Sequence, residues 1–204
     1  MSESIEYYSS SETSKLSKIL SPIWRDIGFP EKLSSARKEA IKLLKHMIQQ
    51  EPNEWLYWYA LTRYLSYGGF ELELSEAVRA GEFCCQLKPN DLRSLYTLGN
   101  ALRSILRAKY YIPTKGLPQK EMLEIMKREV ETSRAWPGPD IFSFRASYES
   151  LQALGLTLEQ AAEKTIRIYE LVLSKASKNN EKKVLRDSLN TMSSEFPFIQ
   201  RYVL

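Results

Sequence analysis

Few side chains in this sequence belong to the types that carry out catalysis or hold metals. The single histidine, His46, has no cysteine or carboxylate at metal-ligand spacing around it. Cys84 and Cys85 are adjacent, whereas redox and metal pairs need two intervening residues, so we expect both to be buried as small apolar side chains. No phosphate-binding glycine loop, zinc-protease motif or nucleophile-elbow motif occurs in the sequence. The prediction is a protein that is not an enzyme, with no cofactor and no metal site.

Aromatic side chains are abundant by comparison. The chain has 12 tyrosines and 4 tryptophans, and many of them crowd into residues 55–67. A single helix in a small fold cannot bury all of its faces, so part of this cluster is expected at the surface. Tyrosine and tryptophan at a surface offer flat apolar contact together with a polar group, which suits the binding of another protein.

Composition indicates the elements that carry these side chains. Only 8 glycines and 9 prolines occur among 204 residues, which favours an all-α fold over a β-rich or low-complexity one. No apolar stretch approaches the roughly 18 residues that span a bilayer. Residues 1–14 are rich in serine and glutamate and lack the pattern of a signal peptide, so we expect a disordered leader and a cytoplasmic protein.

Apolar residues recur at intervals of three and four, which is the pattern of amphipathic helices. We expect four helices in the first half: about 31–50, a second one capped by Asn53, 72–87 and 91–110. After the break at 113–118 we expect four more, which end at about residues 134, 154, 176 and 192. Gly155 ends one of them, and Thr157 with Gln160 forms the capping-box pattern that opens the next. The tail after residue 195 is apolar enough to dock on the helices.

The first of these helices repeat with a period of 37 residues. This repetition resembles the tetratricopeptide repeat, whose consensus offsets are matched by Leu95, Leu98, Gly99 and Leu102, by Ala40, Leu44 and Pro52, and by Ala77, Gly81 and Pro89. The resemblance implies antiparallel helical hairpins stacked as a short right-handed solenoid of eight or nine helices. Residues 15–204 would form a single domain, with the best match at 31–110, and with divergent hairpins and a C-terminal capping helix at 118–204.

The resemblance also implies a concave groove lined by the first helix of each hairpin. The resemblance places two sets of residues there, and each set traces one stripe along a helix: residues 56, 59, 63 and 67, and residues 93, 96, 100 and 103. Arginine, asparagine and tyrosine there would suit an extended peptide or a short acidic segment. Tyr59 and Arg63 depart from the lysine and asparagine that the chaperone-binding members of the family use. The predicted partner-binding residues are Leu56, Tyr59, Arg63, Tyr67, Arg93, Tyr96, Asn100 and Arg103.

The predicted function is that of an adaptor or assembly factor that holds a peptide or helix of another protein. With 29 basic and 25 acidic residues the net charge is +4, which argues against nucleic acid as the main partner. Two alternatives stay open. One is RNA binding by the basic C-terminal helices, through Lys164, Arg167, Lys175, Lys178, Lys182 and Lys183. The other is self-assembly into a homo-oligomer, through Trp136, Phe142, Phe196 and Phe198.

Overall fold

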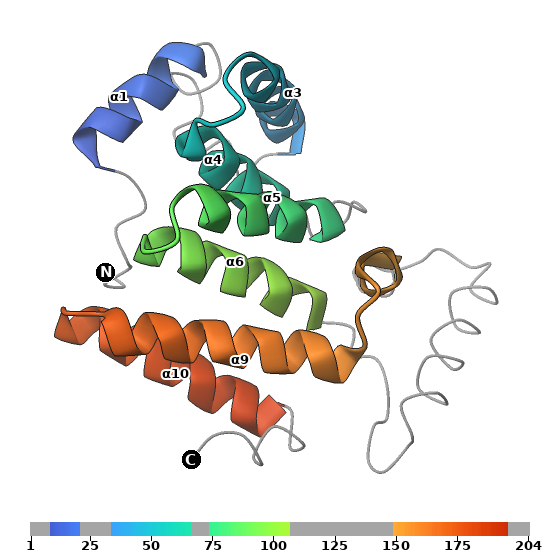
Figure 1. Cartoon of the computed structure of the whole chain (residues 1–204), viewed down its shortest axis with the longest axis vertical. Coiled ribbons are helices and arrows are strands. Elements are labelled where there is room, and N and C mark those ends of the chain that lie inside the picture. Colours follow the sequence, from blue (N-terminus) through green and yellow to red (C-terminus); the bar gives the residue numbers. More distant parts are fainter. Residues whose placement is uncertain (1–8, 21–33, 67–73, 107–148, 196–204) are drawn as a thin grey trace.

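A computed structural model of the chain describes residues 9–20, 34–66, 74–106 and 149–195. Within these ranges the secondary structure is helical and contains no strand, so the predicted all-α class is confirmed for them (Figure 1). No helix in the described ranges is both long and apolar enough to cross a membrane.

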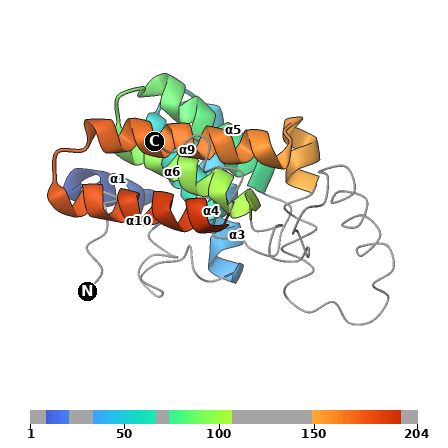
Figure 2. The same ribbon diagram turned by 90° about the horizontal axis from the view of Figure 1, so that it is seen from below.

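The helices lie one after another along the longest axis of the molecule (Figure 1). Viewed from the α10 end, they overlie one another (Figure 2). α3 packs on α4, α4 packs on both α5 and α6, α5 packs on α6, α6 packs on α9, and α9 packs on α10. Residues 149–154 are also helical and precede α9. The bounds are α1 Ser10–Ile19, α3 Ser34–Gln50, α4 Trp55–Ser66, α5 Leu74–Leu87, α6 Leu92–Ile105, α9 Leu158–Lys175 and α10 Asn179–Glu195.

Several predicted helix ends are confirmed. The Thr157 hydroxyl accepts a hydrogen bond from the Gln160 backbone N–H, and the Gln160 side chain accepts one from the Thr157 backbone N–H, which is the predicted capping box of α9. Asp91 caps α6 by accepting from the backbone N–H groups of Arg93 and Ser94. Gly155 has a φ of +62°, a left-handed conformation that ends the preceding helix.

Two local predictions are wrong. At the start of α4 the carboxylate of Glu54, not the side chain of Asn53, accepts from a backbone N–H, that of Leu56. Residues 10–14, which we assigned to a disordered leader, belong to α1, because Ser9 and Glu12 form a capping box.

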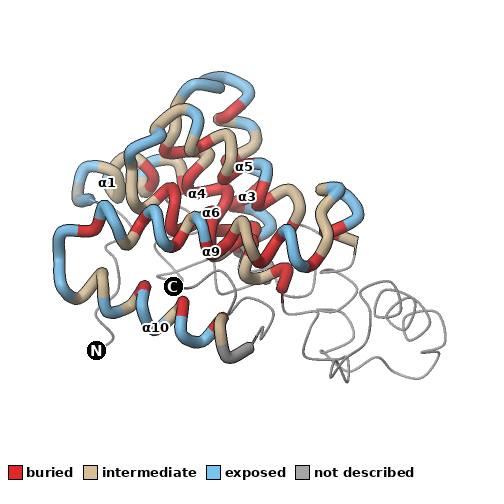
Figure 3. The backbone as a smooth tube through the Cα atoms, turned by 60° about the horizontal axis from the view of Figure 1, so that its bottom comes forward, coloured by how far each residue is buried: buried red, intermediate tan, exposed pale blue. Residues whose placement is uncertain are grey.

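The core is centred on α4 and α6, where most residues are buried (Figure 3). α10 instead buries only one stripe, formed by Leu185, Leu189 and Met192. The rings of Trp58 and Phe83 join α4 to α5 with their centroids 4.6 Å apart.

Glycines permit close approach at two helix pairs. A Cβ atom on Gly99 of α6 would lie 2.5 Å from Cε1 of Tyr169 on α9. A Cβ atom on Gly81 of α5 would lie 3.1 Å from Cδ1 of Leu98 on α6. These contacts explain why small residues occur at both positions.

Some predictions fall outside the described residues. They concern the helices expected between 118 and 148, Tyr67 of the predicted groove, and the four aromatic residues considered for self-assembly, Trp136, Phe142, Phe196 and Phe198.

Candidate functional site

The starts of α4 and α6 and the end of α5 bring cations and aromatic rings together. The Lys88 ammonium lies 3.7 Å from the centroid of the Trp55 ring, and the Arg93 guanidinium lies 5.3 Å from the same centroid. Arg93 also lies 5.9 Å from the ring centroid of Tyr59. Cations within about 6 Å of an aromatic face are attracted to its negative potential. This cluster therefore combines positive charge with flat apolar surface.

Asp91 positions the Arg93 side chain. Its Oδ2 atom accepts a hydrogen bond of 3.0 Å from Nη2 of Arg93, while its Oδ1 atom caps α6. Burial alone would raise the pKa of Asp91, but the hydrogen bonds from Arg93 and from the Ser94 backbone N–H hold it below its ordinary value. Asp91 therefore stays ionised at neutral pH and keeps the guanidinium oriented.

Arg93 holds the carboxylate of Glu12 on α1 at two points. Nη1 of Arg93 donates to Oε2 of Glu12 at 2.5 Å, and Nη2 donates to Oε1 at 3.0 Å. Such two-point pairs combine strength with a fixed geometry. Burial acts to raise the pKa of Glu12, but the hydrogen bonds from Arg93 and Ser9 lower it overall. The hydrogen bond to Glu12 likewise raises the pKa of Arg93, in spite of burial, so both partners stay charged.

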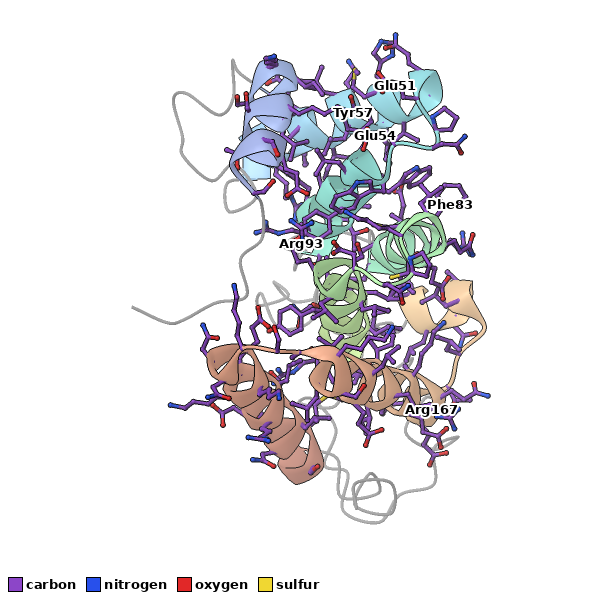
Figure 4. All side chains as sticks on the ribbon, turned by 60° about the vertical axis from the view of Figure 1, so that its left-hand side comes forward. Glu51, Glu54, Tyr57, Phe83, Arg93 and Arg167 are labelled. Atoms are coloured by element: carbon purple, nitrogen blue, oxygen red, sulfur yellow. The ribbon has the colours of Figure 1, made fainter. Side chains whose placement is uncertain are left out.

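A second ion pair and two leucines complete the contact of α1 with the stack. Lys15 pairs with Glu54, and its ammonium lies 5.0 Å from the centroid of the Tyr57 ring. The hydrogen bond to Glu54 raises the pKa of Lys15. Leu16 and Leu20 are fully buried in the common core. Figure 4 shows Glu54, Tyr57 and Arg93 near α1. We call Glu54, Trp55, Tyr57, Tyr59 and Arg93 the α1-binding face.

The predicted groove residues divide between the core and contacts with other helices of the same chain. Leu56, Tyr59 and Arg63 of α4 are buried. On α6, Tyr96 packs its ring against Tyr169 of α9, with centroids 5.8 Å apart. Asn100 accepts a hydrogen bond of 2.6 Å from the Tyr169 hydroxyl.

The two arginines of the predicted set that lie on α6 have different surroundings. Arg93 contacts α1, whereas Arg103, in the last turn of α6, is half-buried. Of the groove residues, the structure therefore places Tyr59 and Arg93 in the α1-binding face, while Tyr96 and Asn100 contact α9. Partner binding by this set stays a prediction.

The remaining candidates for chemistry do not belong to this face, although Cys84 lies beside it, with Sγ 3.6 Å from the Trp55 backbone oxygen. Cys84 is buried and donates from Sγ to the Ser94 hydroxyl at 3.3 Å, and burial raises the pKa of its thiol to about 11. Burial raises the pKa of Cys85 to about 12. His46 is exposed on α3, within hydrogen-bond distance of Gln50. In the described part of the chain no group of three histidine, cysteine or acidic residues gathers at a metal-binding spacing.

Part of the basic C-terminal stretch is engaged in the fold. Lys164 of α9 pairs with Glu82 of α5, and Lys175 donates to the side chain of Asn90 at 2.9 Å. Arg167 is largely exposed and points away from the stack (Figure 4). Two of the six basic residues thus help to attach α9 to the preceding hairpin.

Comparison of this chain with protein-family models, with curated proteins and with solved structures finds no match.

Proposed function

We propose that this protein is a non-catalytic adaptor or assembly factor that holds a peptide or helix of another protein. In this proposal the hairpins stack as a short right-handed solenoid similar to tetratricopeptide repeats, and the protein acts in the cytoplasm. The packing of α4 on both α5 and α6 supports such a stack, because each hairpin of a solenoid contacts the first helix of the next one.

The observation that carries the proposal is the two-point contact between Arg93 and the carboxylate of a helix, α1. Asp91 orients the guanidinium, and the Trp55 ring lies beside it, so a carboxylate meets a prepared cation next to an apolar surface. Arginine and aromatic residues with these surroundings are the types that dominate the binding energy of protein interfaces. The proposed binding site is therefore the α1-binding face.

The test is affinity purification from the native lysate with three immobilised full-length baits: the wild type, Arg93→Ala and Arg186→Glu. Arg186 is an exposed arginine on α10, and its replacement by glutamate, a larger change of charge than Arg93→Ala, serves as the control. Each eluate is analysed by mass spectrometry with and without nuclease treatment. We expect at least one protein that the wild type and Arg186→Glu retain and that Arg93→Ala loses, because Arg93 supplies the carboxylate contact.

Equal recovery on all three baits would contradict the proposed site. Recovery that nuclease abolishes would favour the alternative of RNA binding through the basic C-terminal helices. Circular dichroism and urea unfolding of each bait establish that a loss of binding does not reflect a loss of folding.

A further inference from the structure

α1 meets the rest of the protein as a short ligand would. Glu12, Leu16 and Leu20 follow one another at intervals of four residues, which places them on one face of the helix. The first supplies a carboxylate to Arg93, and the other two are fully buried. α1 does not run closely along the backbone of another described helix, whereas α3 to α6, α9 and α10 all do. Its attachment depends on side chains at a few points.

Part of the face that receives α1 is held in place by residues outside α1. Asp91, which orients Arg93, belongs to the same helix start, and Lys88, which lies on the Trp55 ring, comes from the end of α5. Lys88 also lies 3.5 Å from the Asp91 carboxylate. Arg93 and the Trp55 ring would thus keep their contacts with Asp91 and Lys88 if Glu12 withdrew, and another carboxylate could take the place of Glu12.

We propose that α1 is an internal ligand that occupies the binding face, and that the partner is an amphipathic helix with the same chemistry. The partner helix carries a carboxylate followed, four and eight residues later, by leucine or a similar apolar residue. This inference rests on the proposed function and adds to it the class of partner and its regulation. Partner and α1 compete, so the protein binds its partner only to the extent that α1 leaves.

The competition has a quantitative consequence. A ligand that belongs to the same chain acts at an effective concentration that is typically in the millimolar range. The apparent affinity for an external helix is the intrinsic affinity multiplied by the fraction of molecules in which α1 has left the face. Any change that detaches α1 should therefore strengthen the binding of an external helix, even though that change adds no contact.

The experiment uses α1 itself as the external helix. The probe is a capped, fluorescein-labelled synthetic peptide with the sequence of residues 9–20, and its binding is measured by fluorescence anisotropy. The proteins are the full-length wild type, Leu16→Asp, and the matched control Leu171→Asp, which places the same substitution at an exposed leucine of α9. A buried aspartate at position 16 is strongly disfavoured and should detach α1.

We expect Leu16→Asp to bind the peptide at least about tenfold more tightly than the wild type and Leu171→Asp do. A peptide with Glu12→Gln should bind Leu16→Asp about tenfold more weakly, since it loses the charged contact with Arg93. Equal affinity of wild type and Leu16→Asp for the peptide would overturn the inference.

A second measurement uses the wild type only, so that it does not depend on how Leu16→Asp folds. Hydrogen exchange is followed with and without saturating unlabelled peptide. We expect the amides of α1 to lose protection while those of α4 and α6 keep theirs. Unchanged protection of α1 in the saturated complex would overturn the inference.

The two proposals fail in different ways. A partner protein that depends on Arg93 but leaves α1 protected in the complex would refute the competition and retain the adaptor. Displacement of α1 by the peptide, without any partner protein that depends on Arg93, would support the internal ligand and refute the adaptor.

Discussion

α6 carries two attachments of opposite character. Along its side, α9 packs closely, with the Tyr169 ring against Gly99 and against the Tyr96 ring. At its start, α1 is held by the charged contact between Glu12 and Arg93. Apolar packing of this kind is insensitive to salt and largely to pH, whereas ion pairs depend on both. α9 also carries the ion pair between Lys164 and Glu82, and α1 also buries Leu16 and Leu20, so the two helices differ in the balance of apolar and charged contacts. We therefore expect α1 to be released more readily than α9.

The largest effect is expected at the α9 attachment. Replacement of Tyr169 by alanine removes a fully buried ring and should lower the free energy of unfolding by about 3–5 kcal/mol. Tyr169→Phe keeps the ring but removes the hydroxyl that donates to Asn100, and it should cost about 1 kcal/mol. Urea unfolding measures both. Similar losses for the two variants would mean that the hydroxyl, not the packing, holds α9.

A second prediction concerns the close approach at Gly99. Alanine there should destabilise the protein by about 1–3 kcal/mol, because its Cβ would overlap the buried Tyr169 ring. Gly81→Ala is the matched control, since its Cβ would come no closer than 3.1 Å to a neighbouring side chain, compared with 2.5 Å at Gly99. We expect a clearly smaller loss at position 81 by thermal or urea unfolding. The opposite order would place the tighter helix contact between α5 and α6.

A third prediction compares two helix caps. Asp91→Ala and Thr157→Ala each remove a side-chain cap and should each cost about 1 kcal/mol of stability. Asp91→Ala should in addition reduce the protection of α1 in hydrogen exchange, because Asp91 orients Arg93. Thr157→Ala should leave α1 unchanged. Equal protection of α1 in both variants would show that Arg93 needs no such support.

The smallest effect is a local one that depends on pH. The native pKa values of Glu12 and Asp91 lie below their unfolded values, so the stability they confer is complete above about pH 4.5. That stability is lost as the pH falls through the native pKa values. As the pH falls below about 4.5 through the native pKa of Glu12, the NMR signals of α1 should therefore shift towards unfolded positions before those of α9 do. In Glu12→Gln this step should diminish, and its persistence would assign it to another group.

Much of the helical architecture could be predicted from local signals. Caps depend on residues within one turn of each other, so the pattern of Thr157 and Gln160 sufficed to place the start of α9. The same pattern at Ser9 and Glu12 was available for α1, but the polar composition of the first 14 residues obscured it. A second sequence signal for a helix here was the spacing of Leu16 and Leu20, which stand four residues apart, as on one helix face.

The surroundings of the candidate site were less predictable. The stripe that contains Tyr96 and Asn100 was visible, but its neighbour Tyr169 follows Asn100 by 69 residues in the chain. Helical periodicity indicates which residues share a face and does not indicate which helix covers that face. Arg93 was predicted as a binding residue from the family resemblance and its stripe, while its contact with Glu12 spans 81 residues and has no local signature.

One oxygen atom of Glu12 takes part in both the folding and the docking of α1. Oε2 accepts from the Ser9 backbone N–H at 2.7 Å, which closes the capping box, and it also accepts from Arg93. A helix of 10 residues is marginal in water when isolated, so α1 gains order and attachment together. Detachment then amounts to a transition from helix to coil, and the released segment regains the conformational entropy of an unfolded chain. That entropy offsets part of the energy lost at the contact. The proposed exchange of α1 for another helix is then a disorder–order switch, in which the Glu12 carboxylate acts together with Leu16 and Leu20.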